Sequence, residues 1–188
     1  TRDIVANKNV FGKTIASCRF FGGKEFEILA GDAPGNAATL AAVQGFISGG
    51  TFALPSFSDS GGPMPGTGGK GRITGPFTDS AETRAALASL YCALMVAESL
   101  DAIHSKADVI VDGPFSQNDV FLAVLAGLRP RQTVFASEAR DGTAAGAACL
   151  ALMQDGKLPH IDIAMRKVTP PLLEGLAAYQ ENWRRSAS

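Results

Sequence analysis

The chain has 188 residues, a length that predicts a single domain of ordinary size. Hydrophobic residues make up 46% of it and charged residues 19%, and this composition excludes bulk disorder. Seventeen lysines and arginines oppose eighteen acidic residues, which gives a formal charge of −1, and there is no basic tract of the kind that binds a nucleic-acid backbone.

Cysteines and histidines are too few to build a metal cluster or a disulfide framework. Cys18, Cys92 and Cys149 lie far apart among apolar neighbours, so we expect buried thiols in a reducing, cytoplasmic compartment. The longest uncharged run, 33–58, contains prolines, glycines and polar residues, and we therefore reject a membrane helix there. No signal peptide is expected at the start of the chain.

The first half of the chain predicts short elements separated by turns. Residues 4–20 are extended around a turn at Gly12, and a brief strand, 52–54, stops at Pro55. Two short helices are expected, at 24–30 and 37–47. Residues 55–78 are rich in glycine, proline and serine, with only 72–74 extended; a loop of this length is either functional or disordered.

The second half alternates helices and strands. Asp79 and Glu82 have the spacing of a capping box, and a regular apolar face follows them. The predicted helices are 80–104, 117–128, 143–153 and 172–184, and the predicted strands are 108–112, 132–136 and 161–164. This alternation predicts an α/β sheet with parallel pairing.

Two motif matches fail on their context. Residues 66–71 match GxGxxG, but they follow a proline-rich turn and precede an extended segment, whereas a dinucleotide fingerprint joins a strand to a helix. The segment around Ser60 resembles the nucleophile segment of chymotrypsin-like serine proteases. In that family the histidine base precedes the serine, and here both histidines, His104 and His160, follow it. A serine hydrolase is therefore disfavoured.

A third signal has the context that its chemistry needs. The strand at 109–111 leads into a glycine turn, 112–118, and then into a helix. Such a turn presents backbone N–H groups to a phosphate at the carboxyl end of a strand, where ligands of open α/β sheets bind. Asn118 offers a donor and an acceptor for a nucleobase or a ribose. The structural alternative is a plain turn in which Ser116 or Asn118 caps the helix.

A second strand–turn–helix unit follows about thirty residues later. Residues 138–148 contain a run of alanine and glycine that leaves room for a flat ring or for another element. The unit is therefore either a wall for a base or a tightly packed helix. Two such units suit one nucleotide lying across adjacent strand ends.

Four segments together resemble the C-terminal lobe of FGGY-family carbohydrate kinases, in the fuculose- and xylulose-kinase-like branch. They are FFGGKEFE at 20–27, ALPSF at 53–57, DGPFSQN at 112–118 and GTAAGAA at 142–148. Their order spans nearly the whole chain. One departure is clear: the double glycine of the family's adenosine motif is Gly113-Pro114 here, which removes one backbone donor.

The resemblance implies an actin-like (ribonuclease-H-like) ATPase lobe, with a mixed sheet and flanking helices over 1–188, in which 1–50 joins an N-terminal lobe. It implies an enzyme that transfers a phosphoryl group from ATP, with Mg²⁺, to a sugar hydroxyl. The catalytic aspartate and most sugar contacts belong to the N-terminal lobe, so this chain alone is expected to be inactive, with no catalytic residue or metal ligand assigned to it. The nucleotide-binding residues implied are Gly113, Pro114, Phe115, Ser116, Asn118, Gly142, Thr143 and Gly146.

The expected partners are the N-terminal sugar-binding lobe and a sugar substrate, with no nucleic acid and no membrane. A homo-oligomer stays open, and the sequence does not identify the sugar. The competing interpretation is a non-catalytic interaction module that has lost nucleotide binding, and Pro114 is the residue that favours it.

Overall fold

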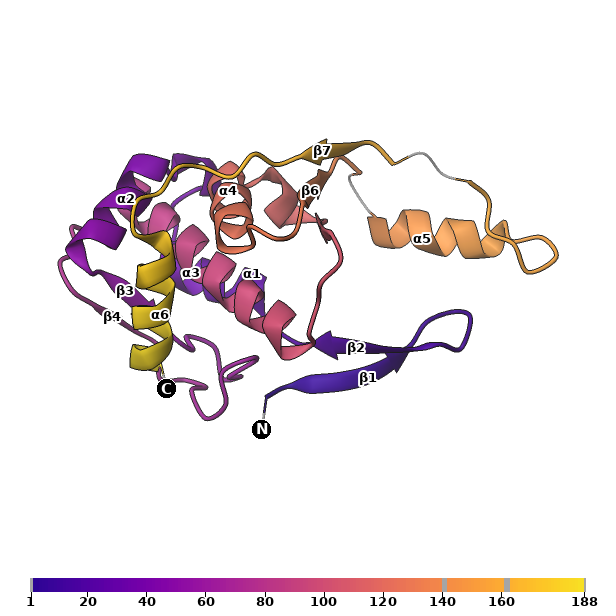
Figure 1. The fold of residues 1–188 in the computed structure, drawn as a ribbon, viewed down its shortest axis with the longest axis horizontal. Coiled ribbons are helices and arrows are strands. Elements are labelled where there is room, and N and C mark those ends of the chain that lie inside the picture. Colours follow the sequence, from indigo (N-terminus) through magenta and orange to yellow (C-terminus); the bar gives the residue numbers. More distant parts are fainter. Residues whose placement is uncertain (1, 140–141, 161–162, 188) are drawn as a thin grey trace.

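The computed structural model describes residues 2–139, 142–160 and 163–187. Within this part, seven short strands form three separate small sheets, accompanied by six α-helices (Figure 1). The arrangement confirms the predicted mixed α/β class. The core is built around one long helix, α3 (Ala81–Ala102).

The chain begins with an exposed β-hairpin, in which β1 (Ile4–Lys8) pairs antiparallel with β2 (Thr14–Cys18). The Asn9 side chain accepts hydrogen bonds from two backbone N–H groups of the turn. Gly12 supplies the left-handed conformation that the turn requires, with a φ of +76°. The predicted extended structure and turn are confirmed, and within the described residues β1 has β2 as its only strand partner.

Two helical segments follow the hairpin. The first is α1 (Gly22–Ala30), which ends at Gly31. The second was predicted as one helix over 37–47 but is divided into a short 3₁₀ turn, η1 (Gly35–Ala37), and α2 (Leu40–Gly49). The division falls at Thr39, which is extended and caps α2 by accepting a 3.1 Å hydrogen bond from the Ala42 N–H.

The glycine-rich loop lies between β3 (Phe52–Leu54) and β4 (Arg72–Thr74), which pair antiparallel at the predicted positions. Backbone hydrogen bonds cross the loop from Ser56 to Thr67, at 3.0 Å, and from Gly69 to Ser58, at 2.8 Å. These bonds give the loop a defined structure.

The central helix α3 starts at a different cap from the one predicted. Ser80 and Thr83 form the capping box, with hydrogen bonds of 3.2 and 3.0 Å in the two directions. The predicted box of Asp79 and Glu82 is wrong, because Asp79 instead forms an ion pair with Arg84. Among the described residues α3 is long and apolar enough to cross a membrane, but 72% of its most apolar stretch is buried inside the fold, as in a core helix.

The third sheet has the order β5–β6–β7. β5 (Val109–Val111) and β6 (Val134–Ser137) are parallel, as predicted, and β7 (Met165–Lys167) runs antiparallel to β6. A strand predicted at 161–164 therefore begins later, at Met165, while 161–162 lie outside the described residues. β5 forms the edge of this sheet within the described part. Between β5 and β6 lie a 3₁₀ turn, η2 (Pro114–Gln117), and α4 (Asp119–Leu128).

The last helix, α6 (Leu176–Ala187), ties the end of the chain to β3. The Tyr179 hydroxyl donates to the Thr51 carbonyl at 2.5 Å, and the Trp183 indole donates to the Ala53 carbonyl at 2.7 Å. Both aromatic side chains are buried.

Helix α5 (Gly142–Ala151) projects away from the body of the molecule (Figure 1). None of its residues is buried, so the predicted alternative of a tightly packed helix is wrong. The predicted burial of the cysteines holds for Cys92, whereas Cys18 and Cys149 are only half-buried, and all three are free thiols.

Candidate functional site

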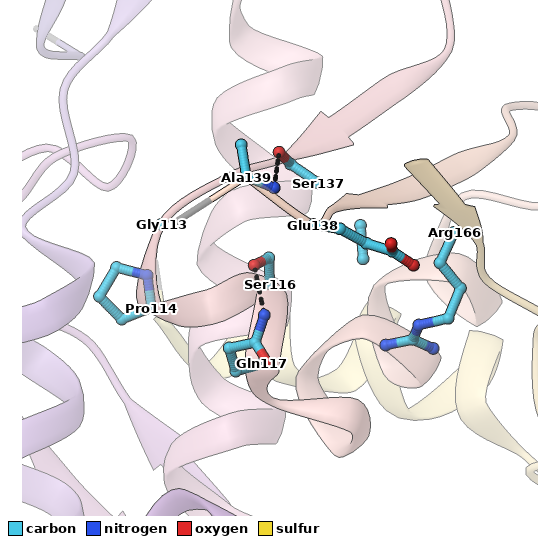
Figure 2. A pocket seen from close by; sticks show the side chains of 9 residues that line it. Gly113, Pro114, Ser116, Gln117, Ser137, Glu138, Ala139 and Arg166 are labelled. Atoms are coloured by element: carbon cyan, nitrogen blue, oxygen red, sulfur yellow. Dashed lines mark hydrogen bonds between the residues drawn. The ribbon is translucent and has the colours of Figure 1, made fainter. Parts of the chain in front are cut away.

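A cleft of about 600 Å³ lies at the carboxyl ends of the parallel strands β5 and β6 (Figure 2). The turn after β5 forms one side of it, and the residues that follow β6, together with Arg166 of β7, form the other. The lining residues are Gly113, Pro114, Ser116, Gln117, Ala136, Ser137, Glu138, Ala139 and Arg166. Sequence reasoning predicted a ligand at this edge of the sheet.

The turn after β5 takes its shape from Gly113 and Pro114. Gly113 has a φ of +72°, which side-chain-bearing residues rarely adopt. Pro114 then opens η2, because its fixed φ suits the first helical position and its missing N–H is not needed there. Because η2 intervenes, α4 begins at Asp119 and not at Gln117 as predicted.

Asn118 caps α4 from a buried position. Its side-chain oxygen accepts a 2.9 Å hydrogen bond from the Phe121 N–H, and its amide nitrogen donates to the Ser89 hydroxyl at 2.9 Å. The residue is 8% exposed. The capping interpretation is confirmed for Asn118, while Ser116 is buried beside it and accepts from the Gln117 amide.

The first cleft contains two charged residues that sequence reasoning missed. Glu138 follows β6 directly, just as Asp112 follows β5, and this shared position at the strand ends was the available signal. The position of Arg166 at the cleft depends on the pairing of β7 with β6, a long-range contact that no local sequence pattern predicts. Figure 2 shows both side chains at the cleft, and Arg166 forms a 2.9 Å ion pair with Asp119 of α4.

A second cleft, of about 560 Å³, lies on the other side of η2, between that turn and α1. Its lining is more apolar, and Phe26 and Phe115 meet edge to face with ring centroids 5.9 Å apart. Gly23, Glu27, Gly35, Asn36, Pro114, Gln117 and Asn118 complete it. Pro114 and Gln117 line both clefts, so the two clefts share η2 as a common wall.

The predicted residues of α5 line neither cleft. A side chain at Gly142 would overlap the Asp112 carboxylate, which explains a glycine at this position without reference to a ligand. Thr143 is exposed, and a side chain at Gly146 would meet open space. The eight predicted residues are thus divided between the clefts and a helix that stands apart from them.

A buried carboxylate in the FFGGKEFE segment was also missed. Glu25 is 0% exposed, and four donors point at it: the Phe57 N–H at 2.7 Å, the Ser58 N–H and hydroxyl at 3.1 and 2.6 Å, and the Tyr91 hydroxyl at 2.9 Å. It therefore fastens the glycine-rich loop to α1 and α3. The available signal was its place four residues before the buried Leu29, on the same helix face.

The surroundings of Glu25 shift the acidity of its neighbours. Burial, together with the Glu25 carboxylate, raises the pKa of the Tyr91 hydroxyl far above its usual range. Burial likewise raises the pKa of the Cys92 thiol. Both groups are therefore protonated at neutral pH, and Cys92 is not a reactive thiolate.

The described residues around Ser60 do not form a hydrolase site. Its hydroxyl oxygen accepts a 3.3 Å hydrogen bond from the Gly62 N–H. No hydrogen bond joins it to His104 or His160 in the part of the chain that the structure describes, and both histidines are exposed. No group of three or more His, Cys, Asp or Glu side chains gathers as a metal site among those residues either.

Comparison with known proteins identifies a family and a similar solved structure. The family model described as "Carbohydrate kinase FGGY, C-terminal domain" matches residues 1–159. A solved carbohydrate kinase from Novosphingobium aromaticivorans is similar at 30% sequence identity with a TM-score of 0.73, over 99% of this chain and 40% of that one. No curated protein matches. The chain thus spans 40% of the length of the solved kinase.

Proposed function

This chain belongs to the FGGY carbohydrate kinase family and has its actin-like fold, and from this we propose that it is the nucleotide-binding C-terminal lobe of an ATP-dependent sugar kinase. The observation that carries the proposal is the cleft at the carboxyl ends of β5 and β6, beside the Gly113-Pro114 turn. Ligands of open α/β sheets bind at this edge. The proposal includes the predicted N-terminal lobe, which would supply the catalytic aspartate and most of the sugar contacts.

The nucleotide lies across η2, with its base in the second cleft and its ribose and phosphates in the first. The apolar lining and the Phe26–Phe115 pair suit a flat base, and the exposed Asn36 amide, with the second N–H of the Asn118 amide that capping leaves over, suits its polar edge. This replaces the predicted base wall at 142–146, because α5 lines neither cleft.

The residues at the strand ends suit a nucleotide that carries Mg²⁺. Magnesium is commonly held by one or two carboxylates together with substrate phosphates, so a dedicated cluster is not required. Asp112, exposed directly after β5, is the carboxylate nearest in sequence to the turn. When bound, ATP with Mg²⁺ supplies the phosphoryl group, and this chain's residues bind and orient it.

The competing proposal, a non-catalytic interaction module, rests on Pro114. A proline has no N–H for a phosphate oxygen, but its place at the start of η2 gives it a structural role that does not depend on a nucleotide. The three free cysteines support a reducing, cytoplasmic setting under either proposal.

Isothermal titration of the two-lobed kinase with Mg-ATP tests the proposal. We expect saturable binding that weakens in Gln117→Ala, because Gln117 lines both clefts. The matched control is Gln154→Ala, at an exposed position outside both clefts, and its affinity should equal that of the wild type. Absence of Mg-ATP binding by the folded wild type would refute the proposal and favour the interaction module.

A further inference from the structure

Among the residues that the structure describes, the carboxylate of Glu138 in the first cleft has no partner. It and Arg166 are the charged residues among those that line the cleft. The Arg166 guanidinium forms an ion pair with the Asp119 carboxylate, with 2.9 Å between Nη2 and Oδ1. The Glu138 side chain has no hydrogen bond or ion pair with any residue that the structure describes, and it is exposed at the cleft (Figure 2).

The strand register explains why the lack of a partner is notable. Arg166 lies opposite Ala136, and the backbone N–H of Glu138 donates to the Ala164 carbonyl at 3.0 Å. Alternate residues of a strand point to the same face, so Glu138 and Arg166 share one face as diagonal neighbours. Long side chains reach across such a diagonal. Asp119, at the start of α4, holds the guanidinium in a different pair and leaves the carboxylate available to a ligand.

The chemistry of a free carboxylate selects one part of a nucleotide. A carboxylate is an acceptor only, and it repels phosphate groups. A vicinal diol offers two O–H donors that match its two oxygens, and hydrogen bonds to a charged group are stronger than those between neutral groups. The ribose is the part of ATP that carries such a diol, and the Gly113-Pro114 turn lies on the other side of the cleft for the phosphates.

We propose that Glu138 binds the ribose hydroxyls of the nucleotide, and that Asp119 is a positioning residue that keeps Arg166 away from Glu138. This inference rests on the proposed function. It gives the nucleotide a direction in the cleft, with its ribose at the end of β6 and its phosphates toward the end of β5.

The test is the affinity of the two-lobed kinase for ATP, 2′-deoxy-ATP and 3′-deoxy-ATP at one fixed Mg²⁺ concentration. We expect the wild type to bind ATP about tenfold more tightly than either deoxy analogue, since each analogue lacks one hydrogen bond to a charged group. Glu138→Ala should bind all three alike, at the affinity of the weaker ligands or below. The matched control, Glu174→Gln, changes an exposed carboxylate outside both clefts and should keep the tenfold preference.

Asp119→Asn supplies an independent readout. Without the Asp119 charge, Arg166 is free to pair with Glu138, so the preference for ATP over the deoxy analogues should fall although Asp119 itself does not line the cleft. A melting curve of each variant confirms that it is folded. An unchanged preference in folded Asp119→Asn would refute the positioning role.

Two further outcomes would overturn the assignment of Glu138. Equal losses for ATP and both analogues in Glu138→Ala, which disappear when Mg²⁺ is removed, would make Glu138 a ligand of the cation and not of the ribose. An unchanged preference for ATP in folded Glu138→Ala would refute the inference alone. If the wild type binds no ATP, the proposed function fails first, and the two failures are thus distinguished.

Discussion

Replacing Glu25 with glutamine keeps the size of a buried side chain while removing half of its acceptors. Each carboxylate oxygen of Glu25 accepts two hydrogen bonds, at distances from 2.6 to 3.1 Å. In Glu25→Gln one oxygen becomes an NH₂ group, so in either orientation one backbone N–H, of Phe57 or of Ser58, faces another donor, while the hydroxyl beside it can turn and accept from the NH₂. A buried donor left unsatisfied costs about 1–3 kcal/mol, and this is the expected loss in the free energy of unfolding.

Urea unfolding followed by tryptophan fluorescence measures this loss. The chain has a single tryptophan, Trp183, which is 0% exposed and reports exposure of the core. Glu27→Gln is the matched control: this residue lies two positions along the same helix, its side chain is 72% exposed, and its ion pair with Lys24 is long, at 3.9 Å. We expect the control to change stability by less than about 0.5 kcal/mol.

Limited digestion with trypsin gives a local readout of the same change. The loop that Glu25 fastens runs to Lys70 and Arg72, and its backbone is held at Phe57 and Ser58. Cleavage at these basic residues should be faster in Glu25→Gln than in the Glu27→Gln control. A loss of less than about 1 kcal/mol, with unchanged cleavage, would refute the argument that the carboxylate holds the loop.

Three further predictions follow from buried or exposed positions. Asn118→Ala removes a helix cap and a buried hydrogen bond, so we expect the free energy of unfolding to fall by about 2 kcal/mol and the melting temperature by roughly 4–8 °C. An unshifted melting curve would contradict the capping role. Burial raises the pKa of both tyrosines of the chain, Tyr91 and Tyr179. Near pH 10 the tyrosines of the unfolded chain therefore lose their phenolic protons, while those of the folded protein keep them. The free energy of unfolding is thus unaffected by these two groups below about pH 10, and above it falls by up to about 2.7 kcal/mol per pH unit. Phenolate absorbance should rise only together with unfolding, and a separate phenolate titration in the folded protein would refute this. Gly146→Ala should slow amide exchange in α5 by up to about fivefold, because the added methyl group raises helix propensity and meets only open space. Gly142→Ala should not slow exchange, since its methyl group would meet the Asp112 carboxylate. Equal slowing in both variants would show that this contact does not matter.

Local signals placed many of the elements. The strands at 52–54 and 72–74 coincide with β3 and β4, where Pro55 and flanking glycines punctuate the chain. The start of α3 was predicted within one residue, but its capping box was assigned wrongly, because Asp79 with Glu82 and Ser80 with Thr83 have the same spacing one residue apart. The choice between them depends on Arg84, which takes Asp79 as its partner. Side-chain geometry decides which of two such pairs forms the cap, and the spacing of residues in the sequence does not predict the outcome.

Only the part of the candidate site that depends on local sequence was predicted. The turn after β5 is local, so its glycine and the Asn118 cap were visible in the sequence. Glu138 and Arg166 come together only through the register of β7 against β6, which is a long-range pairing. The alanine-rich run of α5 suited either a packed helix or a wall for a base, and composition alone did not reveal that the helix stands apart.

In the part of the chain that the structure describes, β1 and β5 each have a free edge, which bears on the solubility of this chain when it is produced alone. A strand edge offers a row of unpaired N–H and C=O groups to any neighbouring chain, and proteins usually protect such edges with charges, prolines or bulges. β5 reads Val-Ile-Val, without a charge, and Ile110 is 58% exposed on it, while Ile4 and Ile15 are each 43% exposed on the hairpin. At high concentration we expect these edges to favour strand pairing between copies of the chain. Ile110→Lys is the smallest change that protects the β5 edge, since it places a charge on an exposed side chain and leaves the core untouched.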